Sequence, residues 1–186
     1  ALHQYLVTHH AKAIDWTKVH FFFGDERLVP HSHESSNARM AFESLLTPLA
    51  IPPVHIHLIP THLAPQAAAD DYESTLSIIL SSLHCTHFDL VLLGMGADGH
   101  TLSLFPGQDS INEPKRLCIS VVAPAPFAIP DRITLTLPSI LTAKERLLLV
   151  TGTDKKSTLQ AALKTGSLLP IALARPTSII TDIPNH

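Results

Sequence analysis

One stretch in the middle of the chain constrains the fold more than any other. An apolar run, Phe88–Leu93, stops abruptly and is followed by glycines interleaved with an acid and a histidine: Gly94, Gly96, Asp98, Gly99 and His100. A short apolar run that ends in glycine is typical of a buried strand, and closely spaced glycines permit a sharp turn after it. The sequence therefore predicts a buried strand that delivers an acid and an imidazole onto a loop.

Other short apolar segments lie on both sides of this strand and alternate with helical patterns. Predicted strands cover residues 19–24, 55–59, 117–122, 133–137, 147–150 and 178–181. Predicted helices cover 2–14, 35–49, 65–83, 138–145 and 153–164. This alternation predicts an α/β fold whose mostly parallel, Rossmann-like sheet has helices on both faces. We expect residues 1–186 to form a single domain of this kind.

The composition narrows the classes of function. Hydrophobic residues make up 45% and charged residues 16% of the 186 residues, as in globular proteins. A net charge of -3 argues against nucleic acid or an anionic membrane as a partner. No apolar run approaches the roughly 18 residues of a membrane span. Two cysteines at no metal or redox spacing predict a reducing, cytoplasmic location.

The chain contains thirteen histidines, some of them in pairs that resemble metal ligands. His31 and His33 form one such pair, and His55 and His57 another. No cysteine or acid lies at a matching spacing, which favours solvated or core histidines and no metal. A metal reading stays open for the second pair, because alternate residues of a strand point to one face.

The glycine loop has two interpretations. Its spacing satisfies the dinucleotide-binding fingerprint, but Pro106 follows too soon for a long helix and no acid ends the next strand. In the alternative, the glycines present Asp98 and His100 on the same side of an extended segment. A lone Asp-x-His pair more often belongs to a surface loop, but its place at the carboxyl end of a strand favours a catalytic role.

Three sequence blocks together are similar to the 6-phosphogluconolactonase family. The first is the segment from Phe88 to Pro106, FDLVLLGMGADGHTLSLFP. The second is GDERLVP (24–30) with Ser-Asn-x-x-Met (36–40), and the third is RITLT (132–136) with Gly-x-x-Lys (152–155). The resemblance runs in order from about Ile14 to about Leu163. It implies a carboxylic ester hydrolase of the oxidative pentose phosphate pathway, which opens 6-phosphoglucono-1,5-lactone to 6-phosphogluconate without a metal or cofactor.

The resemblance also implies catalytic roles. His100 is the general base that activates water, and Asp98 orients it or binds sugar hydroxyls; alternatively, Asp98 only stabilises its own turn. Arg27 stabilises the oxyanion or holds substrate oxygens, and the alternative is a salt bridge to Asp25 or Glu26.

Further residues are candidates for binding the substrate and its phosphate. Arg132 and Lys155 are expected to bind the phosphate, although Lys155 alternatively is a solvated charge on its helix. Asn37 faces the substrate or caps a helix, and Gly96 and Gly99 shape the binding loop.

The chain departs from the family pattern at its start. Family members normally begin with a strand and a Ser-Gly-Gly loop that supplies phosphate-binding amides, and this sequence contains no Ser-Gly-Gly. We expect an N-terminally incomplete fragment of a longer protein, such as a fusion to a glucose-6-phosphate dehydrogenase, or a domain with weakened phosphate binding. A lost central strand would leave an apolar gap or an unpaired strand edge.

Two other functions remain as alternatives. Glucosamine-6-phosphate deaminases share the implied fold and a similar Asp-Gly-His turn, but the Gly-Asp-Glu-Arg block favours the lactonase. A non-catalytic domain that binds a sugar phosphate or docks a partner would keep the fold without turnover.

Overall fold

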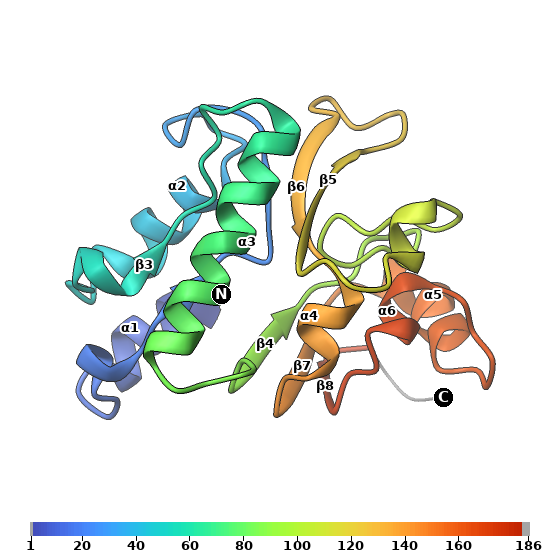
Figure 1. The fold of residues 1–186 in the computed structure, drawn as a ribbon. Coiled ribbons are helices and arrows are strands. Elements are labelled where there is room, and N and C mark those ends of the chain that lie inside the picture. The colour runs from blue at the N-terminus through green and yellow to red at the C-terminus, as the bar shows by residue number, and fades with distance from the viewer. Residues whose placement is uncertain (1, 184–186) are drawn as a thin grey trace.

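The computed structural model describes residues 2–183 and has its strands in three sheets (Figure 1). Two sheets are parallel, and the third is antiparallel. The strands, in sheet order, are β1 (Phe21–Phe22) with β3 (Ile56–His57); β4 (Leu90–Leu93), β7 (Glu145–Val150) and β8 (Ser178–Thr181); and β2 (Asp25–Arg27), β6 (Asp131–Leu135) and β5 (Cys118–Val122). The predicted α/β class with mostly parallel pairing is confirmed.

Helices surround these sheets, several of them beginning with a proline, whose fixed φ suits the first helical turn. The α-helices are α1 (Leu2–His10), α2 (Asn37–Ala41), α3 (Pro65–Ser82), α4 (Leu137–Leu141), α5 (Lys156–Ala162) and α6 (Pro170–Leu173). A π-helical turn, η2 (Phe42–Leu46), continues α2. The 3-10 turns are η1 (Trp16–Lys18), η3 (Pro53–His55), η4 (Asp109–Asn112) and η5 (Thr153–Lys155).

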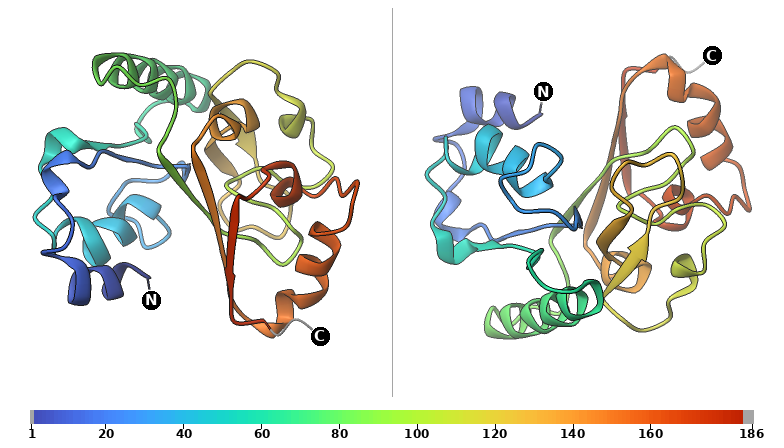
Figure 2. Two further views of the ribbon diagram at one scale, coloured as in Figure 1. Left: turned by 90° about the horizontal axis from the view of Figure 1, so that it is seen from below. Right: turned by 90° about the horizontal axis from the view of Figure 1, so that it is seen from above.

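Helix α3 joins the two sides of the molecule. The views of Figure 2 show the N-terminal part of the chain on one side and the sheet of β4, β7 and β8 on the other. The buried Tyr72 of α3 fixes the N-terminal part by bonding the backbone of Phe23: its hydroxyl accepts from the N–H at 2.8 Å and donates to the C=O at 3.0 Å. The main core therefore extends from α3 to β4, β6 and β7, and a smaller core lies under α1 and η2.

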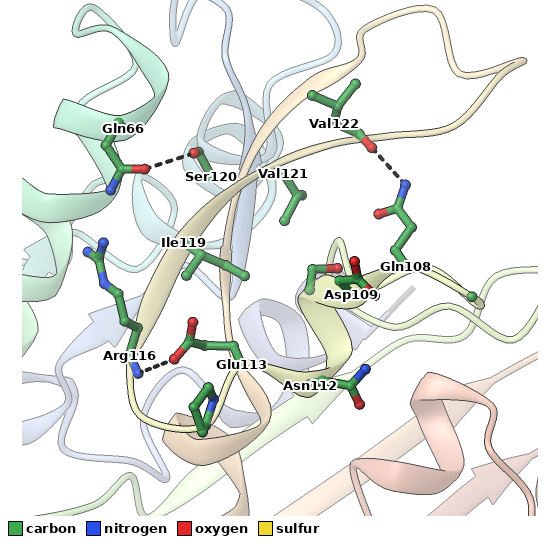
Figure 3. A pocket seen from close by; sticks show the side chains of 13 residues that line it. Gln66, Gln108, Asp109, Asn112, Glu113, Arg116, Ile119, Ser120, Val121 and Val122 are labelled. Carbon is green, nitrogen blue, oxygen red and sulfur yellow. Dashed lines mark hydrogen bonds between the residues drawn. The ribbon is translucent and has the colours of Figure 1, made fainter.

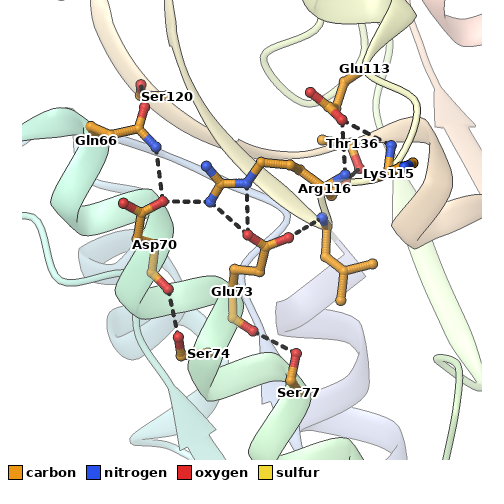
Figure 4. Close-up of polar contacts among 11 residues, drawn as sticks. Gln66, Asp70, Glu73, Ser74, Ser77, Glu113, Lys115, Arg116, Ser120 and Thr136 are labelled. Atoms are coloured by element: carbon orange, nitrogen blue, oxygen red, sulfur yellow. Dashed lines mark hydrogen bonds and ion pairs between the residues drawn. The ribbon is translucent and has the colours of Figure 1, made fainter.

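Ion pairs fix the other side of α3 to the start of β5 (Figure 4). Arg116 donates from Nε to Glu73 at 2.7 Å and from Nη2 to Asp70 at 2.6 Å. Glu73 also accepts from the backbone N–H of Leu117 at 2.5 Å. Both carboxylates of this network are thus used in joining α3 to β5.

The structure corrects several predicted boundaries. Residues 25–27, which follow the predicted strand 19–24 and were not assigned to a strand, form β2 and pair antiparallel with β6; the carboxylate of Glu26 is buried and satisfied by hydrogen bonds. The helix predicted over 35–49 divides into α2 and a π-helical turn, and Met40 is 49% exposed rather than part of an apolar stripe. The helices predicted over 138–145 and 153–164 are shorter, because Glu145 already belongs to β7 and residues 153–155 form a 3-10 turn.

Strand β4, which precedes the glycine loop, is buried on one face only. Val91 and Leu93 are buried, but Leu90 is 53% and Leu92 is 45% exposed, contrary to a strand buried throughout. Within residues 2–183, β4 pairs only with β7, so its other edge is open. The apolar run Phe88–Leu93 thus predicted a strand correctly, but it could not show whether one face or both faces of that strand are covered.

Within residues 2–183, no helix combines the length and the apolar character needed to cross a membrane.

Three histidines gather where β1 and β3 begin. His20 Nδ1 lies 2.9 Å from His57 Nε2, and the rings of His20 and His55 lie 4.4 Å apart between centroids, tilted by 31°. Although they are close, these three histidines are not arranged so that they could hold a metal ion, and within residues 2–183 neither is any other group of three His, Cys, Asp or Glu residues. Burial, followed by the charge of neighbouring histidines, lowers the pKa of both His20 and His57.

This cluster predicts a loss of stability in mild acid. Because the folded pKa values of His20 and His57 lie below the ordinary 6.5, the unfolded chain binds more protons than the folded chain as the pH falls through that value. The free energy of unfolding should therefore decrease below about pH 6.5. Urea denaturation at pH 7.5, 6.5 and 5.5 measures this decrease. In the variant His57→Gln this decrease should be smaller. If the variant and the wild-type protein lose the same free energy of unfolding between pH 7.5 and 5.5, the histidine cluster is not its cause.

Candidate active site

The glycine loop after β4 folds into a compact turn. The N–H of Gly96 donates to the C=O of His100 at 2.9 Å, and the N–H of Gly99 donates to the C=O of Gly96 at 3.0 Å. Gly99 has a φ of +86°, which residues with a Cβ rarely adopt. The hydroxyl of Thr101 closes the turn on the C=O of Gly94 at 2.8 Å. The loop that sequence patterns predicted to be sharply turned is thus held by its own backbone.

Asp98 and His100 contact each other in this turn. The carboxylate Oδ1 of Asp98 lies 2.6 Å from His100 Nδ1 and accepts the backbone N–H of His100 at 3.1 Å. Partial burial alone would raise the pKa of Asp98, but the bonds from His100 outweigh it and hold the pKa below its ordinary value. The predicted proximity is correct, although a turn and not an extended segment produces it. Asp98 both stabilises its turn and orients the imidazole.

Gly96 has no room for a side chain. A Cβ at this position would overlap the imidazole of His100 and lie 2.8 Å from Oδ1 of Asp98. This glycine therefore allows the acid and the imidazole to pack directly on the backbone.

The variant Gly96→Ala should displace His100 from Asp98 and lower the turnover of any reaction that depends on this pair by at least about 100-fold, since a misplacement of about 1 Å can have such an effect. Steady-state kinetics measures the turnover, and the thermal unfolding midpoint reports whether the fold is kept. Gly107→Ala is a control, because no heavy atom lies within 4 Å of a Cβ there, although its φ of +76° adds local strain. Equal turnover in Gly96→Ala and wild-type protein would contradict the packing argument.

Arg27 and Asn37 form a second part of the site, where β2 meets α2. Arg27 Nη1 donates to Asn37 Oδ1 at 3.0 Å and to the C=O of Ser35 at 2.5 Å. Among the described residues Arg27 makes no ion pair, so the alternative salt bridge to Asp25 or Glu26 is not formed. The hydroxyl of Ser36 caps α2, so the alternative of Asn37 as the cap is wrong. Asn37 instead holds the guanidinium of Arg27.

Arg132 lies directly opposite Arg27 in the ladder of β2 and β6. It is 7% exposed, and its Nε donates to the C=O of Ile129 at 2.9 Å. Burial, followed by the charge of Arg27, lowers the pKa of Arg132. Neither guanidinium forms an ion pair with a carboxylate among the described residues. The two positive charges repel each other, and a bound anion would relieve this repulsion. The structure thus brings both predicted arginines together as a candidate anion site.

Asp25 connects the arginines to the glycine loop. Its Oδ2 accepts the hydroxyl of the fully buried Ser103 at 2.6 Å, and its Oδ1 accepts Nδ2 of Asn37 at 3.1 Å. Burial raises the pKa of Asp25, while the bond from Ser103 and the charges of the two arginines oppose this effect. Sequence reasoning did not assign Asp25, because its bonding to Ser103 depends on a contact between segments 78 residues apart.

An aromatic wall lies between His100 and Arg132. The ring of Phe127 packs edge-to-face on the imidazole of His100, 5.6 Å between centroids at 84°. It also contacts the buried Phe105 at 5.1 Å, and Cζ of Arg132 lies 5.5 Å from its centroid. Sequence reasoning missed Phe127, which belongs to the proline-rich loop 123–131. The one available signal was a large aromatic side chain within a proline-dense loop.

Lys155 belongs to a segment that contacts the glycine loop, but no hydrogen bond or ion pair to another described residue fixes its side chain. It ends η5, and the hydroxyl of Thr158 one turn later donates to the C=O of Ala97 at 2.7 Å. Because β4 and β7 are parallel neighbours, the segments that follow them leave the same edge of the sheet. The side chain of Lys155 makes no hydrogen bond or ion pair with another described residue. Its predicted role therefore rests on its position.

The hollow drawn in Figure 3 lies elsewhere. It encloses about 800 Å³ between the start of α3, η4 and β5. None of the predicted site residues lines it, and its one cation, Arg116, is already bound by Asp70 and Glu73. The catalytic candidates thus belong to the loop after β4 and the ladder of β2 and β6, not to this hollow.

Comparison with known proteins matches almost the whole chain to one family. The family described as glucosamine-6-phosphate isomerases/6-phosphogluconolactonase matches residues 1–182. The chain is 41% identical over 167 residues to 6-phosphogluconolactonase 3, chloroplastic, of Arabidopsis thaliana; the match covers 85% of this chain and 51% of the relative. It is 38% identical over 156 residues to the 6-phosphogluconolactonase of Mycobacterium leprae, covering 81% and 63%. The chain thus spans about half the length of the plant relative.

Solved structures agree in fold. The 6-phosphogluconolactonase from Trypanosoma cruzi superposes with a TM-score of 0.83 at 28% identity, covering 97% of this chain and 76% of that one. The enzyme from Thermotoga maritima superposes with a TM-score of 0.79 at 28% identity, covering 95% and 79%. These similarities extend over all three sheets described above.

Proposed function

The chain belongs to the family of glucosamine-6-phosphate isomerases and 6-phosphogluconolactonases, and we propose that it hydrolyses 6-phosphoglucono-1,5-lactone to 6-phosphogluconate in the oxidative pentose phosphate pathway. One observation carries this proposal. An imidazole oriented by a carboxylate, His100 with Asp98, lies one aromatic ring away from the buried Arg132, and Arg132 pairs with Arg27 in the ladder. A phosphorylated lactone requires such a base and such an anion site together.

His100 is proposed to act as the general base. Since the carboxylate of Asp98 accepts a hydrogen bond at Nδ1, we assign the ring proton to Nδ1, which leaves Nε2 as the basic nitrogen. Nε2 bonds no other described residue. It would take a proton from water as the oxygen attacks the lactone carbonyl, and the imidazolium would then protonate the ring oxygen as the C–O bond breaks. Asp98 would stabilise the imidazolium between these two proton transfers.

Arg132 and Arg27 are proposed to hold the substrate's negative charge. Arg132 would bind the phosphate, and Arg27, its neighbour across the ladder, would share the phosphate or a substrate oxygen. Asn37 keeps Arg27 in place, and Lys155 would add charge from the start of α5. Gly96 and Gly99 give the loop its shape. This division of roles would use two like charges that form no ion pair with a carboxylate among the described residues.

Substrate choice tests the proposal. The purified chain should release acid from 6-phosphoglucono-1,5-lactone faster than from the unphosphorylated lactone, because only the former engages the arginines. It should release no ammonia from glucosamine 6-phosphate. Ammonia release would favour the deaminase instead. Binding of 6-phosphogluconate without turnover would favour the non-catalytic domain.

Other aspects of the whole protein are proposals of the same kind. Residues 1–186 are proposed to act as a single lactonase-like domain, and a fused or associated glucose-6-phosphate dehydrogenase remains a prediction. The cytoplasmic location also stays a prediction, and the plant relative's name places that protein in the chloroplast. Cys85 and Cys118 are both free thiols, consistent with a reducing compartment.

A further inference from the structure

The aromatic ring of Phe127 contacts both functional halves of the site. Its loop, residues 123–131, folds back from the end of β5, where the N–H of Phe127 donates to the C=O of Pro124 at 3.2 Å. The ring is 36% exposed, so its contacts with His100, Phe105 and Arg132 do not bury it completely. A partly exposed phenylalanine with these three neighbours lies at the surface of the candidate site and not in the core.

Phe127 restricts the orientation of His100. Phe105 lies 4.9 Å from the imidazole between ring centroids, Phe127 lies 5.6 Å away, and Asp98 bonds Nδ1. These three neighbours hold the plane of the ring and leave Nε2 as its unbonded nitrogen. Aromatic pairs of this geometry are attractive beyond the area that they bury.

Phe127 also supports Arg132. The guanidinium carbon lies 5.5 Å from the ring centroid, within the range of a cation–π interaction. Nε of Arg132 donates to the C=O of Ile129, whereas neither terminal nitrogen of Arg132 forms a hydrogen bond with another described residue. A guanidinium that is stacked on a ring and fixed at Nε presents its other donors in one direction.

We propose that Phe127 is a positioning residue that fixes the imidazole of His100 and the guanidinium of Arg132 relative to each other. The inference rests on the proposed lactonase function. By fixing these two groups, Phe127 would make the enzyme favour substrates in which a phosphate and an ester carbonyl are separated by the width of one sugar ring. Because Phe127 contacts both the imidazole of His100 and the guanidinium of Arg132, it would set the distance between them that such a substrate must match.

The variant Phe127→Leu tests this role, with Phe127→Tyr as the conservative replacement. Leucine keeps an apolar side chain but removes the ring, so we expect kcat to fall roughly tenfold and the Kd for 6-phosphogluconate to rise roughly three- to tenfold. Tyrosine keeps the ring and should stay within about twofold of wild type. Phe42→Leu, a half-buried phenylalanine in the smaller core, is the matched control and should change neither constant.

A second measurement tests the contact without relying on turnover. The NMR resonance of the His100 Cε1 proton should shift in Phe127→Leu, because the ring current is lost, and should not shift in Phe42→Leu. Unchanged kinetics, binding and resonance in Phe127→Leu would overturn the proposal, as would a Phe127→Tyr variant that behaves like Phe127→Leu. If wild-type protein neither turns over nor binds, the lactonase proposal fails, and the resonance alone decides whether Phe127 contacts His100 as the positioning role requires.

Discussion

Replacing His100 by alanine is expected to lower kcat for lactone hydrolysis by roughly 10²- to 10⁴-fold, the usual contribution of a general base. The variant loses the nitrogen that is proposed to take the proton from water and keeps Arg132 and Arg27, the proposed phosphate ligands. The Kd for 6-phosphogluconate should therefore change less than about threefold, or about 0.6 kcal/mol. Initial rates corrected for spontaneous hydrolysis give kcat, and calorimetry gives the Kd.

An exposed histidine provides the control for this variant. His62 lies on the surface and contacts none of the site residues, so His62→Ala should keep wild-type kcat. A His100→Ala protein with wild-type kcat would refute the assignment of His100 as base. A folded variant whose binding weakens as much as its turnover would show instead that His100 contributes to binding.

Replacing Glu26 by glutamine is expected to destabilise the fold by about 2–4 kcal/mol, because a buried charged acceptor of several hydrogen bonds is lost. The Glu26 side chain is 1% exposed and accepts the backbone N–H groups of Arg27, Asn37 and Ala38, each at 2.8 Å, and the hydroxyl of Ser36 at 2.9 Å. Its negative charge lies at the N-terminus of α2, where the helix dipole favours it. An amide would present donors to N–H groups that are themselves donors.

Glu43→Gln is the matched control for Glu26→Gln. Glu43 is 64% exposed in its side chain and only pairs with Arg39 at 2.7 Å within the same helical segment. Exposed pairs of this kind contribute about 0.3–0.5 kcal/mol. Urea denaturation at pH 7 measures both variants. Equal losses of free energy of unfolding in the two variants would contradict the special role of Glu26.

Local sequence was sufficient for the features that depend on contiguous residues. The turn that joins Asp98 to His100 follows from glycines spaced within six residues, and α3 follows from its regular apolar spacing and its initial proline. The pairing of Arg27 with Arg132 required more than local pattern. Their motif blocks indicated a shared site, but only the antiparallel ladder of β2 and β6 places them opposite each other.

Features that depend on distant contacts were not predictable from periodicity. Residues 25–27 carry three adjacent charges, a pattern that does not predict a strand, and only the N-terminus of α2 makes a buried Glu26 favourable. Phe127 reaches the site because its loop folds back over His100, which no spacing in a proline-rich segment reveals. The exposed face of β4 likewise depends on which elements cover it, since an apolar run alone does not specify its neighbours.

Acid release from freshly prepared 6-phosphoglucono-1,5-lactone, followed at constant pH, tests the central claim most directly. We predict that the 186-residue chain raises the initial rate above that of spontaneous hydrolysis in proportion to protein concentration, and that His100→Ala removes nearly all of this increase. Protein that is folded by circular dichroism but leaves the spontaneous rate unchanged would contradict the claim.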